Sequence, residues 1–516
     1  MRLVPQQAHT ARILRLGLPI MAGSSSYVII GLADLLFVGQ FGTAALAAIG
    51  TGSFVGWVFA SAFSGFQIAV QATASRRKGA GQLDSLAIPL NAALILIALG
   101  APIPALLLFA HTGSIFALMS NDAEVITHGV AYLQWIWWSS LLFGMTSAFN
   151  GFWNGTDRPT YYMRVVLVST LANVPLNYVF MFGLGPISAF GVEGAGIGTF
   201  TASAFGVLYH VVLSARFALP EGFARALPAR DECTLLLRLA IPGSTQMVLE
   251  SFALTAMFRI VGMVGTVELA AYTVLVNLIS FVGLPAWGLG TAGATLVGQA
   301  LGAHSVADPR RWAWDVIRVG CPLITVLGVP FWAAPELLLR TFIHEPETLA
   351  MAVTPCRILG VVIILNSVGY MLSSMLNGAG DVKRVMYVNV LTQYVVLLPG
   401  AWLAGPVLGY GFLGIWLVHQ LGFRFAQSLI YASMWHRGKW ARLTLWLACQ
   451  LRRNMRPASA RRVRRSPAYK PALIALHRHN VTGLLVPEQH TLDHFCTDGR
   501  VLGMVNQVDR LGRIIV

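Results

Sequence analysis

The chain has few charged residues, since only 11% of its 516 residues are Asp, Glu, Lys or Arg. A soluble globular domain usually has about 25%, so this composition excludes an ordinary water-soluble protein. Hydrophobic residues make up 56% of the chain, and the mean hydropathy is +0.66. They recur in runs of roughly 20 residues, the length that crosses a bilayer. The composition therefore predicts an all-α polytopic membrane protein.

The patterns of common enzyme and nucleotide sites are also missing. The five cysteines have neither CxxC nor metal-ligand spacing, so we expect buried apolar side chains rather than disulfides or a metal site. No GxxxxGK[ST] loop is present, which argues against direct use of ATP. No cluster of His, Asp or Cys lies near one membrane face, as an intramembrane enzyme would need. We predict a protein that is not an enzyme and has no cofactor.

The chain contains an internal duplication with a constant, ungapped offset, shown by Leu16 and Leu239 (239 − 16 = 223). Further identical residues recur at this offset: Arg15 and Arg238, Pro19 and Pro242, Gly42 and Gly265, Gly79 and Gly302, Asn154 and Asn377, Gly155 and Gly378. A period this long is far beyond that of a solenoid. It predicts two half-proteins of one architecture.

The apolar runs predict twelve membrane helices, six in each half. Their expected spans are residues 13–37, 51–75, 86–110, 130–154, 162–184, 192–215, 235–260, 272–300, 313–335, 353–378, 385–406 and 411–434. Alternate connections are rich in Arg and Lys, and the others carry mostly Asp and Glu. By the positive-inside rule, both termini are cytoplasmic in an inner (plasma) membrane protein. Because six is even, the halves are parallel repeats about an axis along the membrane normal.

The predicted organisation has four parts: an N-lobe bundle over 1–215, a cytoplasmic inter-lobe linker over 216–234, a C-lobe bundle over 235–436 and a basic cytoplasmic tail over 437–516. Residues 452–516 hold 12 Lys/Arg and 4 Asp/Glu, so they supply +8 of the formal net charge of +15 (12 − 4 = 8). Part of the tail is expected to be disordered, and its last residues predict a small hairpin. The tail is either a solvated positive-inside segment or lies on anionic lipid; no nucleic-acid partner is expected.

The N-lobe has one unpaired acid, Asp34, inside its first apolar run. Ionisable groups are costly inside a membrane and are therefore functional candidates. Desolvation favours the neutral acid, whereas water or a cation favours the ionised form, as an ion-coupled carrier requires. Asn173 and Asn177 are four residues apart and so lie on one face of the fifth helix. The alternatives are an acid satisfied by neighbouring hydroxyls or amides, and asparagines that serve helix packing.

The C-lobe has different polar residues, because Met257 stands at the position equivalent to Asp34 (34 + 223 = 257). Its own acid is Glu250, near the middle of the seventh helix. Arg424 of the twelfth helix lies at a depth where it can pair with this acid. Two interpretations stand: a structural Glu250–Arg424 pair, or a second coupling or substrate site.

The stretch LGLPIMAGSSSYVIIGLADLLFVGQFGTAALAAIG resembles the MATE (multidrug and toxic compound extrusion) family. The block RLAIPGSTQMVLESFALTAMFRIVGMVGTVELAAYTVLVN, the segment VGQALGA at 297–303 and the turns NGTDRP and NGAGD are also similar to that family. The resemblance covers roughly residues 10–436. It implies a V-shaped fold of two lobes that exports organic cations or other amphipathic drugs against an inward flow of protons or sodium.

Site residues follow from the same resemblance. Asp34 matches the helix 1 acid of the DinF-like branch, which is central to proton coupling, and Asn173 matches the asparagine that accompanies it. Asn177 stands where that branch carries a second Asp, and Thr199 matches a helix 6 threonine of the same network. The resemblance implies ion coupling through these four residues, with H⁺ favoured over Na⁺.

A second site is implied in the C-lobe, where Glu250 matches the helix 7 acid of the NorM-like branch. Asn366 replaces the helix 10 acid of that branch. Arg424, placed near Glu250 by its depth alone, is the third residue of this candidate coupling or substrate site. The alternative function is a flippase of lipid-linked precursors, which usually needs a cavity rich in basic residues; here Arg259 and Arg424 are the few intramembrane bases. We predict a secondary active efflux transporter with alternating access. Its partners are amphipathic or cationic small molecules and the bilayer, and we expect a monomer.

Overall fold

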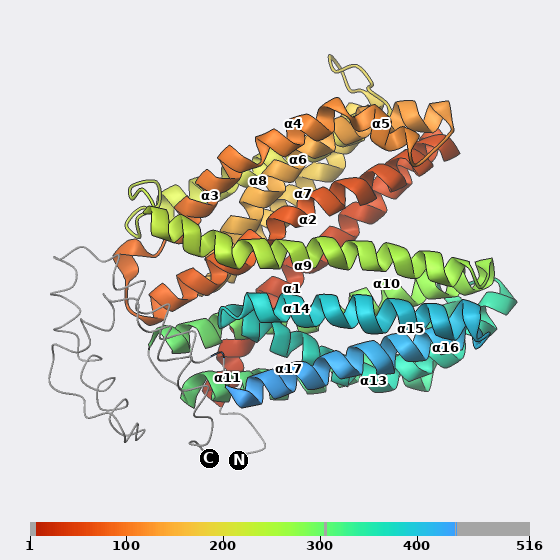
Figure 1. The fold of residues 1–516 in the computed structure, drawn as a ribbon. Helices are drawn as coiled ribbons and strands as arrows, with labels where there is room; N and C mark the ends of the chain where they lie inside the picture. The colour runs from red at the N-terminus through yellow and green to blue at the C-terminus, as the bar shows by residue number, and fades with distance from the viewer. Residues whose placement is uncertain (1–6, 304–306, 439, 441–516) are drawn as a thin grey trace, which may run out of the picture.

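The computed structural model describes residues 7–303, 307–438 and 440, and gives the backbone alone for residues 27–36 and 307. The predicted tail from residue 441 onward, with its hairpin, lies outside the described residues. Every regular element in the described part is helical, apart from an isolated bridge between Leu184 and Ile187. The prediction of an all-α membrane fold is confirmed (Figure 1).

Twelve long helical segments follow one another along the described chain. The first six are α1 (Gln7–Val38), α2 (Thr43–Gly79), α3 with α4 (Ile88–Gly100 and Pro102–Ala110), α6 (Ala123–Gly155), α7 (Pro159–Phe182) and α8 (Val192–Phe217). The next four are α9 (Arg230–Gly262), α10 (Thr266–Gly302), α11 (Ala307–Ala333) and α13 (Pro346–Gly378). The eleventh joins α14 (Val382–Leu391), η3 (Thr392–Leu397), α15 (Leu398–Trp402) and η4 (Leu403–Val407), and the twelfth joins α16 (Gly411–Leu417), η5 (Val418–Phe425) and α17 (Ala426–Arg437). The connections hold η1 (Gly39–Phe41), η2 (Leu83–Ser85), α5 (Thr112–Ala117) and α12 (Pro335–Arg340).

These helices extend beyond the apolar spans that the sequence predicts. α2 begins at Thr43 rather than at residue 51, and α9 begins at Arg230 rather than at residue 235. Hydropathy finds the apolar middle of a helix, whereas the backbone hydrogen bonds continue into its polar ends. Within the described part of the chain, eight helices are long and apolar enough to cross a membrane by length and composition alone. α9 is not among them, and its middle holds the polar residues Ser244, Gln246 and Glu250.

The helices gather in two groups, α2–α8 and α9–α17, with α1 packed between α7 and α10 (Figure 1). Their connections meet at two ends of the molecule. We call one the basic end; it contains Arg76, Arg77, Lys78, Arg158, Arg230, Arg310 and Arg311. We call the other the acidic end; it contains Asp122, Glu193, Glu268 and Glu336. α1 begins and α17 ends at the basic end.

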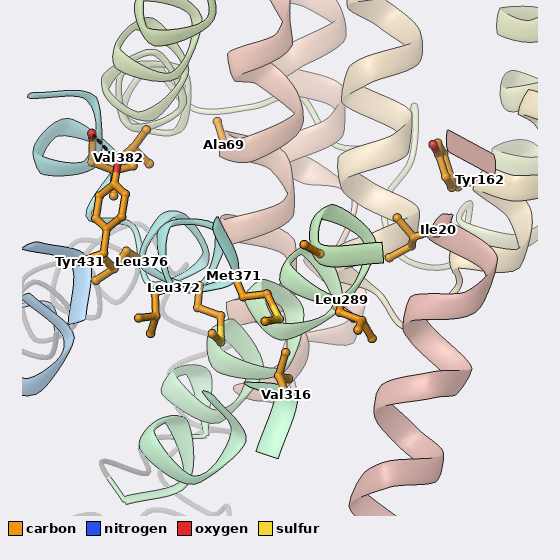
Figure 2. Packing of buried hydrophobic residues seen from close by; sticks show 14 of the residues in the cluster. Ile20, Ala69, Tyr162, Leu289, Val316, Met371, Leu372, Leu376, Val382 and Tyr431 are labelled. Atoms are coloured by element: carbon orange, nitrogen blue, oxygen red, sulfur yellow. Dashed lines mark hydrogen bonds between the residues drawn. The ribbon is translucent and has the colours of Figure 1, made fainter. Parts of the chain in front are cut away.

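The two halves share one hydrophobic core. Its largest cluster crosses from Ala69 of α2 to Leu289 of α10 and Met371 of α13 (Figure 2). A separate cluster stays within the first half near the acidic end, around Val38 and Trp137. Close helix contacts between the halves lie toward the basic end, where Gly17 of α1 meets Leu289 of α10 and Gly65 and Gly79 of α2 meet α9 and α10. The halves are therefore joined mainly at the basic end.

Reciprocal glycine contacts join the halves at this end. Gly79 of α2 lies so close to α10 that an added Cβ would come 1.9 Å from the carbonyl oxygen of Gln299. Gly302 of α10 lies so close to α2 that an added Cβ would come 2.1 Å from the carbonyl oxygen of Arg76. The two contacts are equivalent under the sequence offset (79 + 223 = 302; 76 + 223 = 299). The duplication therefore appears in the structure as a pseudo-twofold contact.

Candidate functional site

A pocket of about 310 Å³ lies between α2 and α9, one helix from each half. Its walls are apolar apart from Ser244 and Thr245, and its other lining residues are Ala62, Phe66, Leu237, Ala240, Ile241, Val248 and Leu249. Gly65 meets α9 beside it, where its N–H donates to the Ser244 hydroxyl at 3.2 Å. The pocket therefore adjoins the contact between the halves, where a change in their relative position would alter its shape.

Two amides form the centre of the candidate site in the first half. Asn173 and Asn177 of α7 are 3% and 0% exposed. The Nδ2 of Asn177 donates to Oδ1 of Asn173 at 3.2 Å, and the Nδ2 of Asn173 lies 3.5 Å from Oδ1 of Asn177. Pro175 lies between them inside the helix, where it removes one backbone donor. The structure therefore brings together the two asparagines that the sequence places on one helical face.

Asp34 belongs to α1, and its side chain lies outside the described part of the structure. Its level along the helix follows from the backbone. α1 and α7 both begin at the basic end and pack side by side, and the hydroxyls of Ser24 and Tyr162 lie 3.2 Å apart. Asp34 comes ten residues after Ser24, and Asn173 comes eleven after Tyr162 (34 − 24 = 10; 173 − 162 = 11). Because both helices rise by the same amount for each residue, Asp34 and Asn173 lie at nearly the same level.

The neighbouring α8 approaches this site through a glycine. A Cβ added to Gly198 would come 2.0 Å from Oδ1 of Asn177, so α8 lies directly against the amide pair. Thr199, the next residue, is half-buried and donates its hydroxyl to the Ala195 carbonyl one turn earlier at 2.9 Å. Among the described residues, no hydrogen bond joins the Thr199 hydroxyl to the asparagines. The contact with Asn177 is made by Gly198.

Sequence reasoning missed one polar residue near this site. Thr170 of α7 is 4% exposed, and its hydroxyl has no hydrogen-bond partner among the described residues. It precedes Asn173 by three residues and Asn177 by seven, so all three side chains share one face of α7. The spacing rule that grouped the asparagines could also have found Thr170. A threonine in a membrane helix usually bonds to its own backbone, however, so its residue type does not mark it as a site candidate.

The charged residues of the second half do not form the direct pair that the sequence suggested. No ion pair joins Glu250 of α9 to Arg424 of η5 among the described side chains. Arg424 donates to Oε1 of Gln427 at 3.4 Å instead. The direct Glu250–Arg424 pair is therefore absent from the described part of the structure.

Amide side chains connect helices of the second half. Asn366 of α13 donates to Oε1 of Gln420 at 2.8 Å, and Gln427 donates to Oδ1 of Asn389 at 2.8 Å. Gln420 belongs to the π-helical η5, and Asn389 shortly precedes the π-helical η3. π-Helical turns often occur at functional sites, because they displace a side chain from the regular helical register. Neither amide partner was expected from the sequence, because each bond joins two different helices and spacing along one helix does not predict such contacts.

Within residues 7–303, 307–438 and 440, no three His, Cys, Asp or Glu side chains gather closely enough to hold a metal ion.

Comparison with known proteins identifies the family. The MatE family model matches residues 19–179 and, a second time, residues 242–403, which together make up more than half of the chain. The chain belongs to the MatE family. The starts of the two matches differ by the offset of the duplication (242 − 19 = 223), so each half is one copy of the family's unit. Members of the MatE family are transporters, and this chain is accordingly a multi-pass membrane transporter and not an enzyme.

Relatives and solved structures agree with this assignment. The chain is 24% identical over 436 residues to a protein of Pasteurella multocida named "Probable multidrug resistance protein NorM", with 82% of the chain and 93% of that relative covered. It is 23% identical over 432 residues to "Multidrug resistance protein MdtK" of Edwardsiella ictaluri, covering 81% and 93%. A structure described as the outward-facing conformation of a multidrug resistance MATE family transporter superposes with a TM-score of 0.76 at 20% identity, covering 84% and 96%. The predicted MATE resemblance is confirmed.

Proposed function

We propose that this MatE-family transporter exports organic cations or other amphipathic compounds in exchange for inward-moving cations, with H⁺ favoured over Na⁺. The buried amide pair of Asn173 and Asn177 carries this proposal, because it lies at the level of Asp34 on the adjacent α1. Amides can donate to an ionised carboxylate and accept from a protonated one, so they accommodate both forms of an exchanging acid. The resemblance to the DinF-like branch supports Asp34 as the coupling residue, with Asn173 and Thr199 as members of its network, and Asn177 stands where that branch carries a second Asp.

The orientation of the chain follows from its charges. The basic end carries the Arg- and Lys-rich connections, so it faces the cytoplasm in an inner membrane, as do the first residues of α1 and the last of α17. Since the halves are joined mainly at this end, the molecule is closed toward the cytoplasm. The N-lobe (1–215) and the C-lobe (235–436) rock about the linker 216–234 to give alternating access. The transporter works as a monomer.

The second half contributes a separate polar region. Glu250, Asn366 and Arg424 lie on three different helices, α9, α13 and the segment of η5, and Asn366 donates to Gln420. This region serves as an additional coupling or substrate site, and its loss impairs transport less than loss of Asp34 does. It contains a single described arginine, which disfavours a flippase that must hold a pyrophosphate.

Transport by the purified chain in proteoliposomes tests this function. A fluorescent organic cation is followed while a proton or a sodium gradient is imposed, and wild type is compared with Asp34→Asn, Glu250→Gln and Asn173→Ala. We expect a proton gradient to drive wild type, Asp34→Asn to abolish the response with the fold intact, and Glu250→Gln to retain part of it. Asn173→Ala is expected to reduce the rate.

Asn277→Ala is the matched control for Asn173→Ala. Asn277 is an exposed membrane-helix asparagine that donates to the carbonyl of Thr273 in its own α10. Its loss should leave transport unchanged. Undiminished export by Asp34→Asn would refute coupling through the first half. Movement of a labelled lipid-linked precursor, with no gradient-driven movement of the dye, would favour the flippase.

A further inference from the structure

Two equivalent side chains cross between the halves at the basic end. Gln299 of α10 reaches the first half, where its Nε2 donates to the carbonyl oxygen of Gly155 at 3.3 Å and to Oδ1 of Asp157 at 2.9 Å. Arg76 of α2, at the equivalent position (76 + 223 = 299), reaches the second half and donates from Nη2 to the carbonyl oxygen of Ala379. Each side chain thus enters an Asn-Gly turn of the other half, 154–157 or 377–381. We call these two crossings the latch.

The crossing at Gln299 is well paired. Oδ2 of Asp157 also forms ion pairs with Lys78 at 3.1 Å and with Arg12 at 3.4 Å. Arg12 in turn donates to Oε1 of Gln299 at 2.7 Å. These contacts join α1, α2, α10 and the turn after α6 through one carboxylate. Hydrogen bonds to a charged group are the stronger class. This crossing therefore stabilises the closed basic end.

The crossing at Arg76 is poorly paired. The side chain is 5% exposed, and among the described residues neither Nε nor Nη1 has a hydrogen-bond partner. No described carboxylate forms an ion pair with it. Asp381, in the turn that Arg76 enters, binds Arg384 at 3.3 Å instead. Burying a cation without a counter-ion is unfavourable, and Arg76 would regain water if the halves separated. This crossing therefore opposes closure.

We propose that the latch is asymmetric: Gln299 holds the basic end closed, and the buried Arg76 favours its opening. The inference rests on the alternating access proposed above. Such a transporter needs two states of similar free energy, because a state that is too stable cannot be left. Equivalent positions of the duplicated chain thus have opposite effects on one equilibrium, and the identity of the residue at each position sets the balance.

The distance between the two halves at the basic end tests this inference. The full chain, with its five cysteines replaced by alanine, receives Leu83→Cys and Arg311→Cys, which are exposed sites in different halves. Spin labels on these cysteines report the closed and open populations by double electron–electron resonance in lipid nanodiscs. We expect Gln299→Ala to raise the open-to-closed ratio at least about tenfold, the effect of losing a hydrogen bond to a charged group. Arg76→Gln is expected to lower the ratio.

Two further variants keep the test decisive. The double variant Arg76→Gln with Gln299→Ala should have a lower open-to-closed ratio than Gln299→Ala alone, closer to that of wild type. This comparison remains measurable even if wild type itself is almost fully closed. Arg76→Lys retains the buried cation, so its open-to-closed ratio should be higher than that of Arg76→Gln. The inference is overturned if Arg76→Gln raises the open population, or if the double variant is as open as Gln299→Ala alone.

These distances are measured without substrate or an ion gradient. They therefore report the latch independently of drug export and of coupling through Asp34. If the expected shifts occurred in a chain that failed to move the dye, the proposed substrate class would be wrong and the latch would stand.

Discussion

Gly198 is the residue whose substitution most directly tests the arrangement of the N-lobe site. The Cβ of Gly198→Ala would lie 2.0 Å from Oδ1 and 2.9 Å from the backbone nitrogen and Cα of Asn177. The amide must rotate away, which breaks its hydrogen bonds with Asn173. The backbone contact must also lengthen, because ordinary van der Waals contact of a Cβ begins at 3.4 Å. α8 therefore has to move away from α7.

The magnitude follows from these two effects. Overpacking of a well-packed contact costs about 1–3 kcal/mol, and loss of a net amide hydrogen bond costs about 0.5–1.5 kcal/mol. Because each step of about 1.4 kcal/mol is a tenfold change in an equilibrium constant, the competent arrangement of the amides should become at least about tenfold less populated. We expect the initial rate of proton-driven dye transport by Gly198→Ala to fall by a similar factor, together with a lower unfolding temperature in detergent.

Gly283→Ala is the matched control for this substitution. Gly283 is also a glycine inside a membrane helix, α10, but a Cβ added there meets no described atom within 4 Å. Its transport rate should equal that of wild type, and its unfolding temperature should be equal or slightly higher, because Ala is the better helix former. The reasoning is refuted if Gly198→Ala transports at the wild-type rate with an unchanged unfolding temperature.

Three further substitutions test the basic end. Gly302→Ala places a Cβ 2.1 Å from the carbonyl oxygen of Arg76, so the open fraction should rise in the spin-label measurement; an unchanged distance distribution would contradict this. Glu232 and Arg77 form a buried ion pair, so Glu232→Gln leaves the Arg77 guanidinium without a carboxylate. The unfolding free energy should fall by about 3–5 kcal/mol, and the unfolding temperature should fall far more than after an exposed Glu→Gln change. Burial raises the pKa of Asp381 from 3.8 to about 6. The protonated carboxyl therefore contributes to stability below pH 4, and this contribution is lost as the pH rises to about 6. Asp381→Asn should remove about 3 kcal/mol of that pH dependence of the unfolding free energy, and equal pH profiles of wild type and variant would exclude this role.

The candidate site shows where sequence reasoning reached its limit. The four-residue spacing of Asn173 and Asn177 predicted one shared helical face, and the structure confirms that their amides meet. The proposed Glu250–Arg424 contact depended on depth alone, and depth does not determine which way a side chain points. Arg424 lies in the π-helical η5, whose hydrogen-bond register cannot be read from hydropathy, and it bonds to Gln427.

The sequence by itself determined the membrane class, the helix number, the duplication and the charge difference between the two ends. These properties depend on local composition and on spacing along the chain, which hydropathy and a constant offset between repeated residues measure directly. Only the tertiary structure decided that the equivalent residues Arg76 and Gln299 cross into opposite halves, and that only Gln299 meets a carboxylate there. Such contacts depend on how closely the backbones of α2 and α10 approach and on which turns they face. Two copies of one architecture can therefore share their backbone contacts and still differ in the charges that those contacts bury.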